Sequence, residues 1–169
     1  QTDLKRRLAY STVSQVSYIT LGTALIAPLS TAGAIVHLVH QGIMKVTLFF
    51  CAGNIAETLE LHDIRDMNGV GRRMPITAAL FTVAGLGMIG VPPLAGFVSK
   101  WYLGLGGLDA GHGWVLGILV ASSLLNAAYF LPVISVLLFE EPDREWPPAG
   151  GGKLEAPWTL LLPPVFTAA

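Results

Sequence analysis

Long stretches of predominantly apolar residues alternate with short polar segments along the chain. A helix of about 20 residues crosses a bilayer and satisfies its own backbone hydrogen bonds in lipid, which an isolated strand does not. Four stretches are that long, and none contains an aspartate or a glutamate: residues 8–27, 34–55, 76–105 and 114–139. The pattern predicts an all-α protein, a polytopic bundle of transmembrane helices.

Turn-forming and charged residues separate these spans. We expect a tight turn at residues 28–33, a polar loop at 57–75, a glycine-rich loop at 106–113 and a proline- and glycine-rich linker at 140–156. A further apolar run starts at residue 157 but reaches only Ala169, too short for a span. We expect a truncated last span, so that residues 1–169 form a single fragment of a longer protein. An interfacial or re-entrant segment is the alternative.

The third span is too long for one straight helix. Its 30 residues would extend about 45 Å, against a hydrocarbon core of about 30 Å. Pro92 and Pro93 each lack an amide donor, and Gly90 and Gly96 loosen the backbone around them. We therefore expect a broken helix near Gly90 to Gly96.

The composition agrees with lipid as the solvent. Charged residues make up 12% of the chain and hydrophobic residues 53%, whereas soluble domains carry about a quarter charged residues. The net charge is −1, and no basic cluster with interleaved aromatic residues indicates nucleic-acid binding. A soluble enzyme and a nucleic-acid-binding protein are both disfavoured.

The basic residues indicate an orientation, because short cytoplasmic loops collect Lys and Arg. The expected loops at 28–33 and 106–113 carry none. Eight of the ten basic residues precede the first span, lie between the second and third, or lie between the fourth and last: Lys5, Arg6, Arg7, Arg65, Arg72, Arg73, Arg144 and Lys153. We expect the residue 1 end to be cytoplasmic, in a bacterial inner membrane.

Lys45 lies in the middle of the second span, where a lysine is costly unless it faces protein or water. On an ideal helix His37, His40 and Gln41 share a face with it. Lysine and histidine can both exchange protons, so this stripe is a candidate proton path through intervening waters. Alternatively, each polar side chain is simply satisfied by a neighbouring helix. A metal site is disfavoured, because no third ligand has suitable spacing.

Lys100 follows the expected helix break. Broken helices at membrane depth expose carbonyl groups and helix ends that can hold ions or protonated groups, so Lys100 is a second candidate proton site. Alternatively, it extends to the outer interface beside Trp101 and Tyr102.

Polar residues in the first and fourth spans have two interpretations: they line water, or they form hydrogen bonds between packed helices. Packing explains most of them. We find no phosphate-binding glycine loop, paired catalytic carboxylates or Ser/His/Asp constellation, and so expect no catalytic chemistry and no cofactor in this chain. The residues concerned are Ser11, Thr12, Ser14, Gln15, Ser17, Tyr18, Thr20, Ser122, Ser123, Asn126 and Tyr129.

Four segments resemble the proton-conducting antiporter family, which includes the large membrane subunits of NADH:quinone oxidoreductase and the large A and D proteins of Mrp-type cation/proton antiporters. Their residues are most similar to the Mrp D-like group. The segments are DLKRRLAYSTVSQ (3–15), HLVHQGIMKVTLFF (37–50), GVGRRMP (69–75) and GVPPLAGFVSK (90–100).

The resemblance implies a protein of about fourteen transmembrane helices, of which this piece is the tenth to thirteenth and part of the fourteenth. Lys45 matches the lysine of the eleventh helix, and Lys100 the lysine at the broken twelfth helix. His37 matches a histidine eight residues before the first lysine. Many relatives have a histidine at the position of Gln41, so His40 is a possible replacement. The input half of the path lies outside this fragment.

Our hypothesis is proton translocation within a multi-subunit Na⁺/proton antiporter, in which Lys45 passes a proton to Lys100 with help from His37 and His40. The implied partners are other membrane subunits, protons and Na⁺. One alternative is a proton-pumping subunit of NADH:quinone oxidoreductase or of a membrane-bound hydrogenase. An alternative of another class is a membrane scaffold that does not pump.

Overall fold

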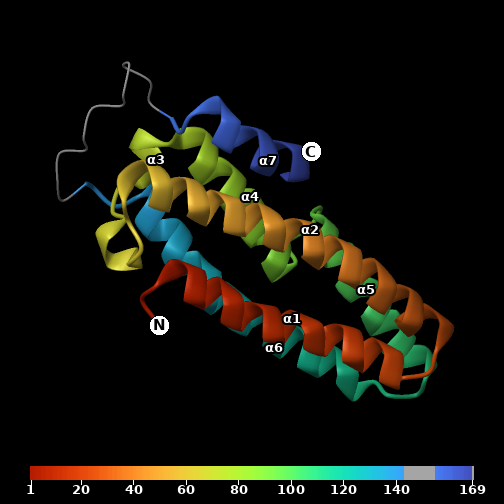
Figure 1. Cartoon of the computed structure of the whole chain (residues 1–169). Coiled ribbons are helices and arrows are strands. Elements are labelled where there is room, and N and C mark those ends of the chain that lie inside the picture. The colour runs from red at the N-terminus through yellow and green to blue at the C-terminus, as the bar shows by residue number, and fades with distance from the viewer. Residues whose placement is uncertain (143–154, 169) are drawn as a thin grey trace. The chain divides into compact units, whose positions relative to one another are not determined.

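The computed structural model describes residues 1–142 and 155–168, and its elements confirm the all-α prediction (Figure 1). Arg144, Lys153 and most of the linker expected at 140–156 lie outside the described residues. The described helices are α1 (Leu4–Ala24), α2 (Pro28–Leu59), the 3₁₀ helix η1 (Ile64–Asp66), α3 (Val70–Arg73), α4 (Pro75–Ile89), α5 (Ala95–Asp109), α6 (Trp114–Leu138) and α7 (Trp158–Ala168).

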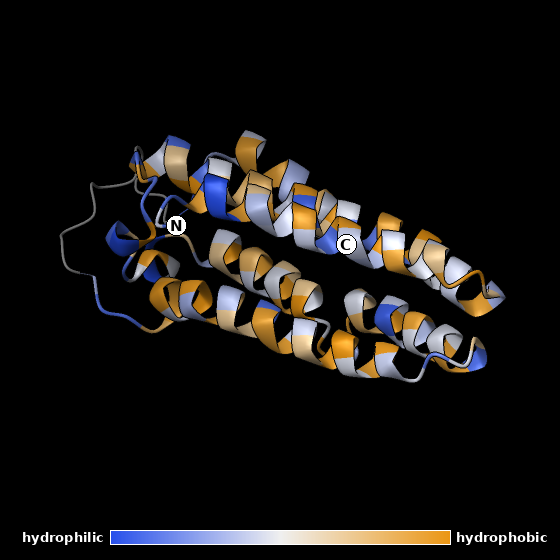
Figure 2. Cartoon of the chain, turned by 90° about the horizontal axis from the view of Figure 1, so that it is seen from below, coloured by the Kyte–Doolittle hydropathy of each residue, from blue (hydrophilic) through white to orange (hydrophobic). Residues whose placement is uncertain are grey.

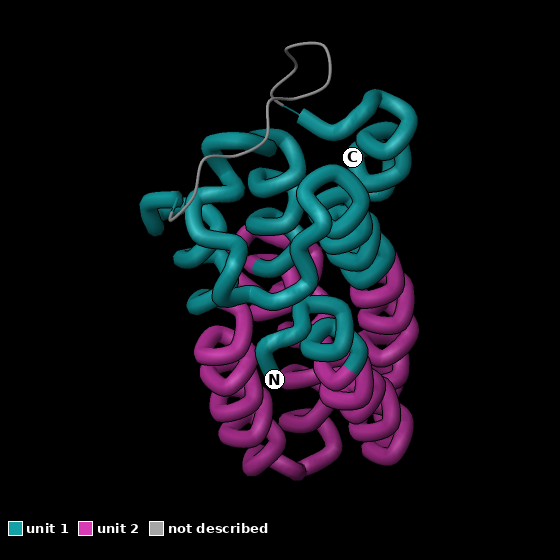
Figure 3. The backbone as a smooth tube through the Cα atoms, turned by 60° about the vertical axis from the view of Figure 1, so that its left-hand side comes forward, with its two compact units in different colours: residues 1–9, 44–85, 131–169 teal, residues 10–43, 86–130 magenta. Residues whose placement is uncertain are grey.

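Two compact units make up the chain (Figure 3). Helices α1, α2, α4 and α6 contribute residues to both units, whereas α5 lies wholly in unit 2. Lys45 belongs to unit 1, and Lys100, His37, His40 and Gln41 belong to unit 2. Unit 1 contains Gln1–Ala9, Met44–Gly85 and Leu131–Ala169, and unit 2 contains Tyr10–Ile43 and Leu86–Phe130.

Helix α2 begins at Pro28, so the prediction of a turn at residues 28–33 is wrong. Proline suits the first position of a helix, where its missing amide hydrogen has no helical partner to lose. The Ser30 hydroxyl donates to the Ala27 carbonyl (2.8 Å) and accepts from the Ala27 amide (3.3 Å). These contacts start a helix here, and the turn lies at residues 25–27.

Helix α5 continues to Asp109, so the glycine-rich loop expected at 106–113 is confined to its second half. Gly106 and Gly107 are buried in this helix because their neighbours leave no room for a side chain. A Cβ at Gly107 would lie 2.9 Å from Cβ of Val115, and one at Gly106 would overlap the backbone of Ser30. Close helix packing therefore outweighs the low helix propensity of glycine.

We expect Gly106→Ala to destabilise the folded protein by about 1–3 kcal/mol or more, since the added methyl group meets backbone atoms that cannot rotate away. Thermal unfolding of the full-length protein in detergent measures this. Gly117→Ala is the matched control, because nothing lies within 4 Å of its added Cβ. Equal unfolding temperatures for the two variants would contradict the close packing of α5 against α2.

The chain leaves the helical conformation after Ile89 and re-enters it at Ala95, as the predicted break requires. Gly90 has φ +90°, a conformation that residues with a Cβ rarely adopt. Gly96 lies beyond the break, in the first turn of α5. Helices α4 and α5 have 15 residues each, about 22 Å, so neither crosses a hydrocarbon core alone.

Contacts between segments distant in the sequence hold unit 1 together. Residues 57–75, expected as one polar loop, contain the end of α2, then η1 and α3. The backbone amide of Leu4 donates to the His62 carbonyl (3.0 Å), which ties the start of α1 to this segment. The Glu155 carboxylate accepts from the Ile76 amide (2.7 Å) and so caps the positive end of α4.

Apolar side chains face outward on the long helices, and Figure 2 shows how few strongly hydrophilic residues interrupt them. On α6, Leu125 is 72% exposed, whereas Asn126 is 5% exposed. Among the described residues, α2 and α6 are long and apolar enough to cross a membrane, and α4 and Trp158–Thr167 are shorter apolar helices. An apolar surface around polar interior groups suits lipid as the solvent.

Candidate functional site

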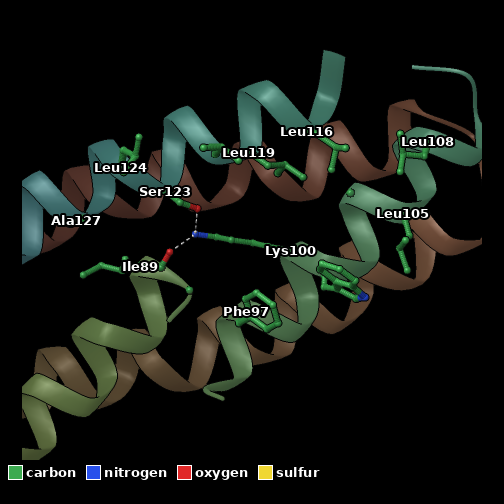
Figure 4. Close-up of a pocket in the computed structure, with 14 residues that line it drawn as sticks. Ile89, Phe97, Lys100, Leu105, Leu108, Leu116, Leu119, Ser123, Leu124 and Ala127 are labelled. Atoms are coloured by element: carbon green, nitrogen blue, oxygen red, sulfur yellow. Dashed lines mark hydrogen bonds between the residues drawn. The ribbon is translucent and has the colours of Figure 1, made fainter. Parts of the chain in front are cut away.

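Lys100 lies in the second turn of α5 with its ammonium group directed at the end of α4 (Figure 4). Its Nζ donates to the carbonyl oxygens of Ile89 (2.8 Å) and Met88 (3.3 Å). In an uninterrupted helix, these carbonyls would accept from the amides of residues 92 and 93. Both residues are proline and have no amide hydrogen. The two prolines therefore free the two acceptors that hold Lys100.

The remaining contacts of Lys100 come from α1 and α6. Nζ donates to the Ser123 hydroxyl (3.1 Å) and lies 5.0 Å from the ring centroid of Tyr18, within cation–π range. Each of the three ammonium hydrogens can thus reach a neutral oxygen. Gly90 makes room for this arrangement, because a Cβ there would lie 3.1 Å from Cδ of Lys100 and 3.2 Å from Nζ.

An apolar cavity of about 480 Å³ lies along the stem of Lys100 in unit 2 (Figure 4). Leucines from α5 and α6 line it, among them Leu105, Leu116 and Leu119. Lys100, Ser123 and the indole group of Trp101 are its polar side chains. In such apolar surroundings a charge and its hydrogen-bond acceptors interact more strongly than they do in water.

His37 lies on α2 at the centre of a buried polar cluster in unit 2, with 1% of its surface exposed. Its Nδ1 contacts the Ser99 hydroxyl at 2.8 Å and its Nε2 contacts Oε1 of Gln15 at 3.1 Å. The ring also packs against Tyr18, with centroids 5.1 Å apart. Tyr18 is thus shared between His37 and the ammonium group of Lys100.

His40 and Gln41 differ in their environments, although helical periodicity places both on the candidate stripe. Gln41 is buried, and within the described residues its Oε1 has no hydrogen-bond partner. His40 is half-buried, and its Nδ1 contacts the Ala95 carbonyl at 2.9 Å, at the start of α5. His40 therefore does not occupy the buried position of Gln41.

Lys45 is 6% exposed and belongs to unit 1. Its Nζ donates to the Leu8 carbonyl oxygen on α1 at 2.9 Å. A helix carbonyl can accept this second hydrogen bond, because its oxygen has two lone pairs. Like Lys100, Lys45 therefore donates to a neutral backbone oxygen.

Sequence reasoning missed three participants in the unit 2 site. The pattern of polar residues does not single out Ser99, and Gln15 and Asn126 belong to larger sets of polar residues that helix packing explains. A signal was present, because Ser99 directly precedes Lys100 and Gln15 is the only amide side chain in α1. The register that joins these residues to His37 depends on helix packing, which a single sequence does not specify.

Comparison with known proteins identifies the family. The sequence pattern of the family described as "NADH:quinone oxidoreductase/Mrp antiporter, TM" matches residues 1–126, most of the chain. The chain belongs to this family. It is thus part of a multi-pass, antiporter-like membrane subunit, and the resemblance inferred from its motifs is confirmed.

Three relatives illustrate the range of the family. The chain is 42% identical to NADH-quinone oxidoreductase subunit N of Desulforudis audaxviator, covering 96% of this chain and 34% of that protein. The structure of respiratory complex I from Thermus thermophilus matches with a TM-score of 0.82 at 27% identity, covering 98% of this chain and 34% of the matched chain. The Mrp complex from Dietzia sp. matches with a TM-score of 0.80 at 29% identity, covering 92% and 29%.

The chain thus spans about a third of the length of these relatives. Its helices, including the pair broken after Ile89, form part of the antiporter-like membrane subunit fold, as predicted. Family membership is common to redox-driven and antiporter complexes, so it does not by itself distinguish between them.

Proposed function

We propose that this chain carries part of a proton-translocating path, in which Lys45 and Lys100 take up and release the proton and His37 and His40 assist. The observation that carries the proposal is the setting of Lys100. Its ammonium group is buried among neutral oxygens, two of which are free because Pro92 and Pro93 interrupt a helix.

The chemistry of this setting suits transient protonation. A buried lysine paired with a carboxylate would be held in its charged form, whereas carbonyl and hydroxyl oxygens solvate the charge without neutralising it. The ammonium group can therefore lose its proton at a moderate cost when a neighbouring charge or water changes. Lys45, which donates to the Leu8 carbonyl, has the same kind of contact.

For the complex in which the path works, we propose a redox-driven, multi-subunit assembly of the NADH:quinone oxidoreductase kind. The 42% identity to a subunit N supports this assignment over the Mrp D-like group that the motifs favour. A Na⁺/proton antiporter is the second candidate, supported by the match to the Mrp complex at a TM-score of 0.80. We place the protein in a bacterial inner membrane, with the residue 1 end cytoplasmic and other membrane subunits as partners.

We expect Lys45→Ala to reduce proton transport by about tenfold or more, which corresponds to at least about 1.4 kcal/mol in the barrier. The measurement uses everted vesicles that carry the complete complex, with either NADH or a Na⁺ gradient as the driving force. Lys5→Ala is the matched control, because Lys5 is an exposed lysine at the start of α1.

Whether NADH or a Na⁺ gradient drives proton transport distinguishes the redox complex from the antiporter. Proton uptake with NADH alone supports the redox complex, and Na⁺-driven exchange supports the antiporter. If Lys45→Ala transports protons as fast as wild type at equal assembly, Lys45 has no place in the path. Loss of assembly without any change in transport per complex would favour the scaffold alternative.

A further inference from the structure

A chain of buried hydrogen bonds runs from His37 across α1 to α6, entirely within unit 2. Oε1 of Gln15 contacts Nε2 of His37 (3.1 Å), and Nε2 of Gln15 donates to Oδ1 of Asn126 (3.4 Å). Nδ2 of Asn126 donates to the Tyr18 hydroxyl (3.3 Å), which donates to the Ser122 hydroxyl (2.6 Å). His37, Gln15, Asn126 and Tyr18 are almost fully buried, so each of these contacts replaces one with water.

The direction of this chain determines which nitrogen of His37 carries hydrogen. An amide side chain has one oxygen that accepts and one nitrogen that donates. Because the Gln15 nitrogen donates to Asn126, its oxygen faces His37. An oxygen without hydrogen can only accept, so Nε2 of His37 must be the donor. In the neutral ring Nδ1 is then the free acceptor.

We infer that Gln15 and Asn126 are positioning residues that hold His37 in its Nε2–H tautomer, so that it exchanges its proton at Nδ1, on the Ser99 side. The inference rests on the proposed function for its role in transport, whereas the tautomer itself is a property of the folded chain. Asn126 acts through Gln15, because its Oδ1 fixes the orientation of the Gln15 amide. Tyr18 in turn fixes Asn126 by accepting from its nitrogen.

Ser99 is placed to serve both protonation states of His37. In the neutral Nε2–H state Nδ1 can only accept, so we expect the Ser99 hydroxyl, 2.8 Å away, to donate to it. A proton that reaches His37 binds Nδ1, because this ring nitrogen carries no hydrogen in the neutral state. The new Nδ1–H then donates to Oγ, and the Ser99 hydroxyl turns to the Gly96 carbonyl (3.1 Å). Nδ1 of His37 therefore has Ser99 as its partner in both protonation states.

The ionisable groups around His37 come from three helices. Tyr18 of α1 packs on the imidazole ring, the ammonium group of Lys100 of α5 lies over the Tyr18 ring, and His40 follows on α2. The two ring nitrogens of His37 instead contact Gln15 and Ser99. The tautomer therefore depends on the amide chain.

Solid-state ¹⁵N NMR of histidine-labelled, full-length protein in lipid tests the inference directly, with His37→Gln identifying the His37 signals. At a pH where His37 is neutral, we expect wild type to show a protonated Nε2 and a non-protonated Nδ1. Gln15→Met has a similar volume without the acceptor, and should shift the ring to the Nδ1–H tautomer, which can donate to Ser99. Gln15→Glu keeps the acceptor and should retain Nε2–H.

Ser17→Ala is the matched control on α1, because the exposed Ser17 hydroxyl bonds to the Val13 carbonyl of its own helix. An Nδ1–H tautomer in wild type, or an unchanged spectrum in Gln15→Met, overturns the inference. The wild-type spectrum by itself shows which tautomer His37 adopts, even if a variant fails to fold. Transport is measured on the same samples, so the expected tautomer together with transport that does not depend on His37 would refute the assisting role of His37 in the proposed function and leave the tautomer assignment intact.

Discussion

Replacing Lys100 by alanine is expected to reduce proton transport by the complete complex by about tenfold or more, at least about 1.4 kcal/mol in the barrier. The variant removes the ammonium group that the carbonyls of Met88 and Ile89 and the Ser123 hydroxyl are positioned to hold. Proton uptake in everted vesicles, normalised to assembled complex, measures the loss.

Lys100→Arg separates a proton-carrying role from a structural one. Arginine keeps the positive charge and the donors, but it does not lose its proton in proteins. A structural lysine would tolerate the change, whereas a proton carrier would not. Transport by Lys100→Arg at the wild-type rate would therefore refute the assigned role, even if Lys100→Ala is inactive. Tyr102→Phe, at a more exposed position on the same helix, should transport normally.

The second large effect is expected from restoring the missing amides. In the double variant Pro92→Ala with Pro93→Ala, the new amide hydrogens can bond to the carbonyls of Met88 and Ile89 and extend α4 by about one turn. Lys100 then shares these two acceptors with the new amides, which weakens its hydrogen bonds to them; hydrogen bonds to a charged group contribute about 1.5–3 kcal/mol each. We expect proton transport to fall about tenfold or more, although Lys100 is still present.

Pro132→Ala in α6 is the matched control, since it restores an amide hydrogen within a helix that is already continuous. It should assemble and transport like wild type. If the double variant also transports like wild type, the free carbonyls are not needed to hold Lys100. Hydrogen exchange at positions 92 and 93 provides a separate check, because bonded amides would exchange slowly.

Much of the architecture could be predicted from local patterns. The lengths of the apolar stretches indicate helices to within a few residues, and adjacent prolines with nearby glycines indicate the break after Ile89. These predictions succeed because they depend on backbone chemistry and on lipid as the solvent, both of which act on each segment separately. The boundaries predicted near Pro28 and Gly106 are wrong for the opposite reason. Pro28 is suited to the first position of a helix, and Gly106 packs against Ser30 of another helix, so in both places turn propensity is overridden.

The candidate site was predictable in its charged residues but not in their neighbours. A lysine in an apolar span stands out in any sequence, so Lys45 and Lys100 need no structure to be noticed. Periodicity alone could not tell that Gln41 is buried and His40 half-buried, because that depends on which helices cover the face of α2.

The sequence by itself determined that this is a membrane protein of the antiporter-like family, that its long apolar stretches are helical with a break after Ile89, and that two lysines lie inside those stretches. Only the tertiary structure decided that the carbonyls freed by Pro92 and Pro93 hold Lys100, and that Gln15 and Asn126 join His37 to α6. The physical reason is that hydropathy and proline chemistry act along the chain, whereas a hydrogen bond between helices requires a register, which packing alone sets.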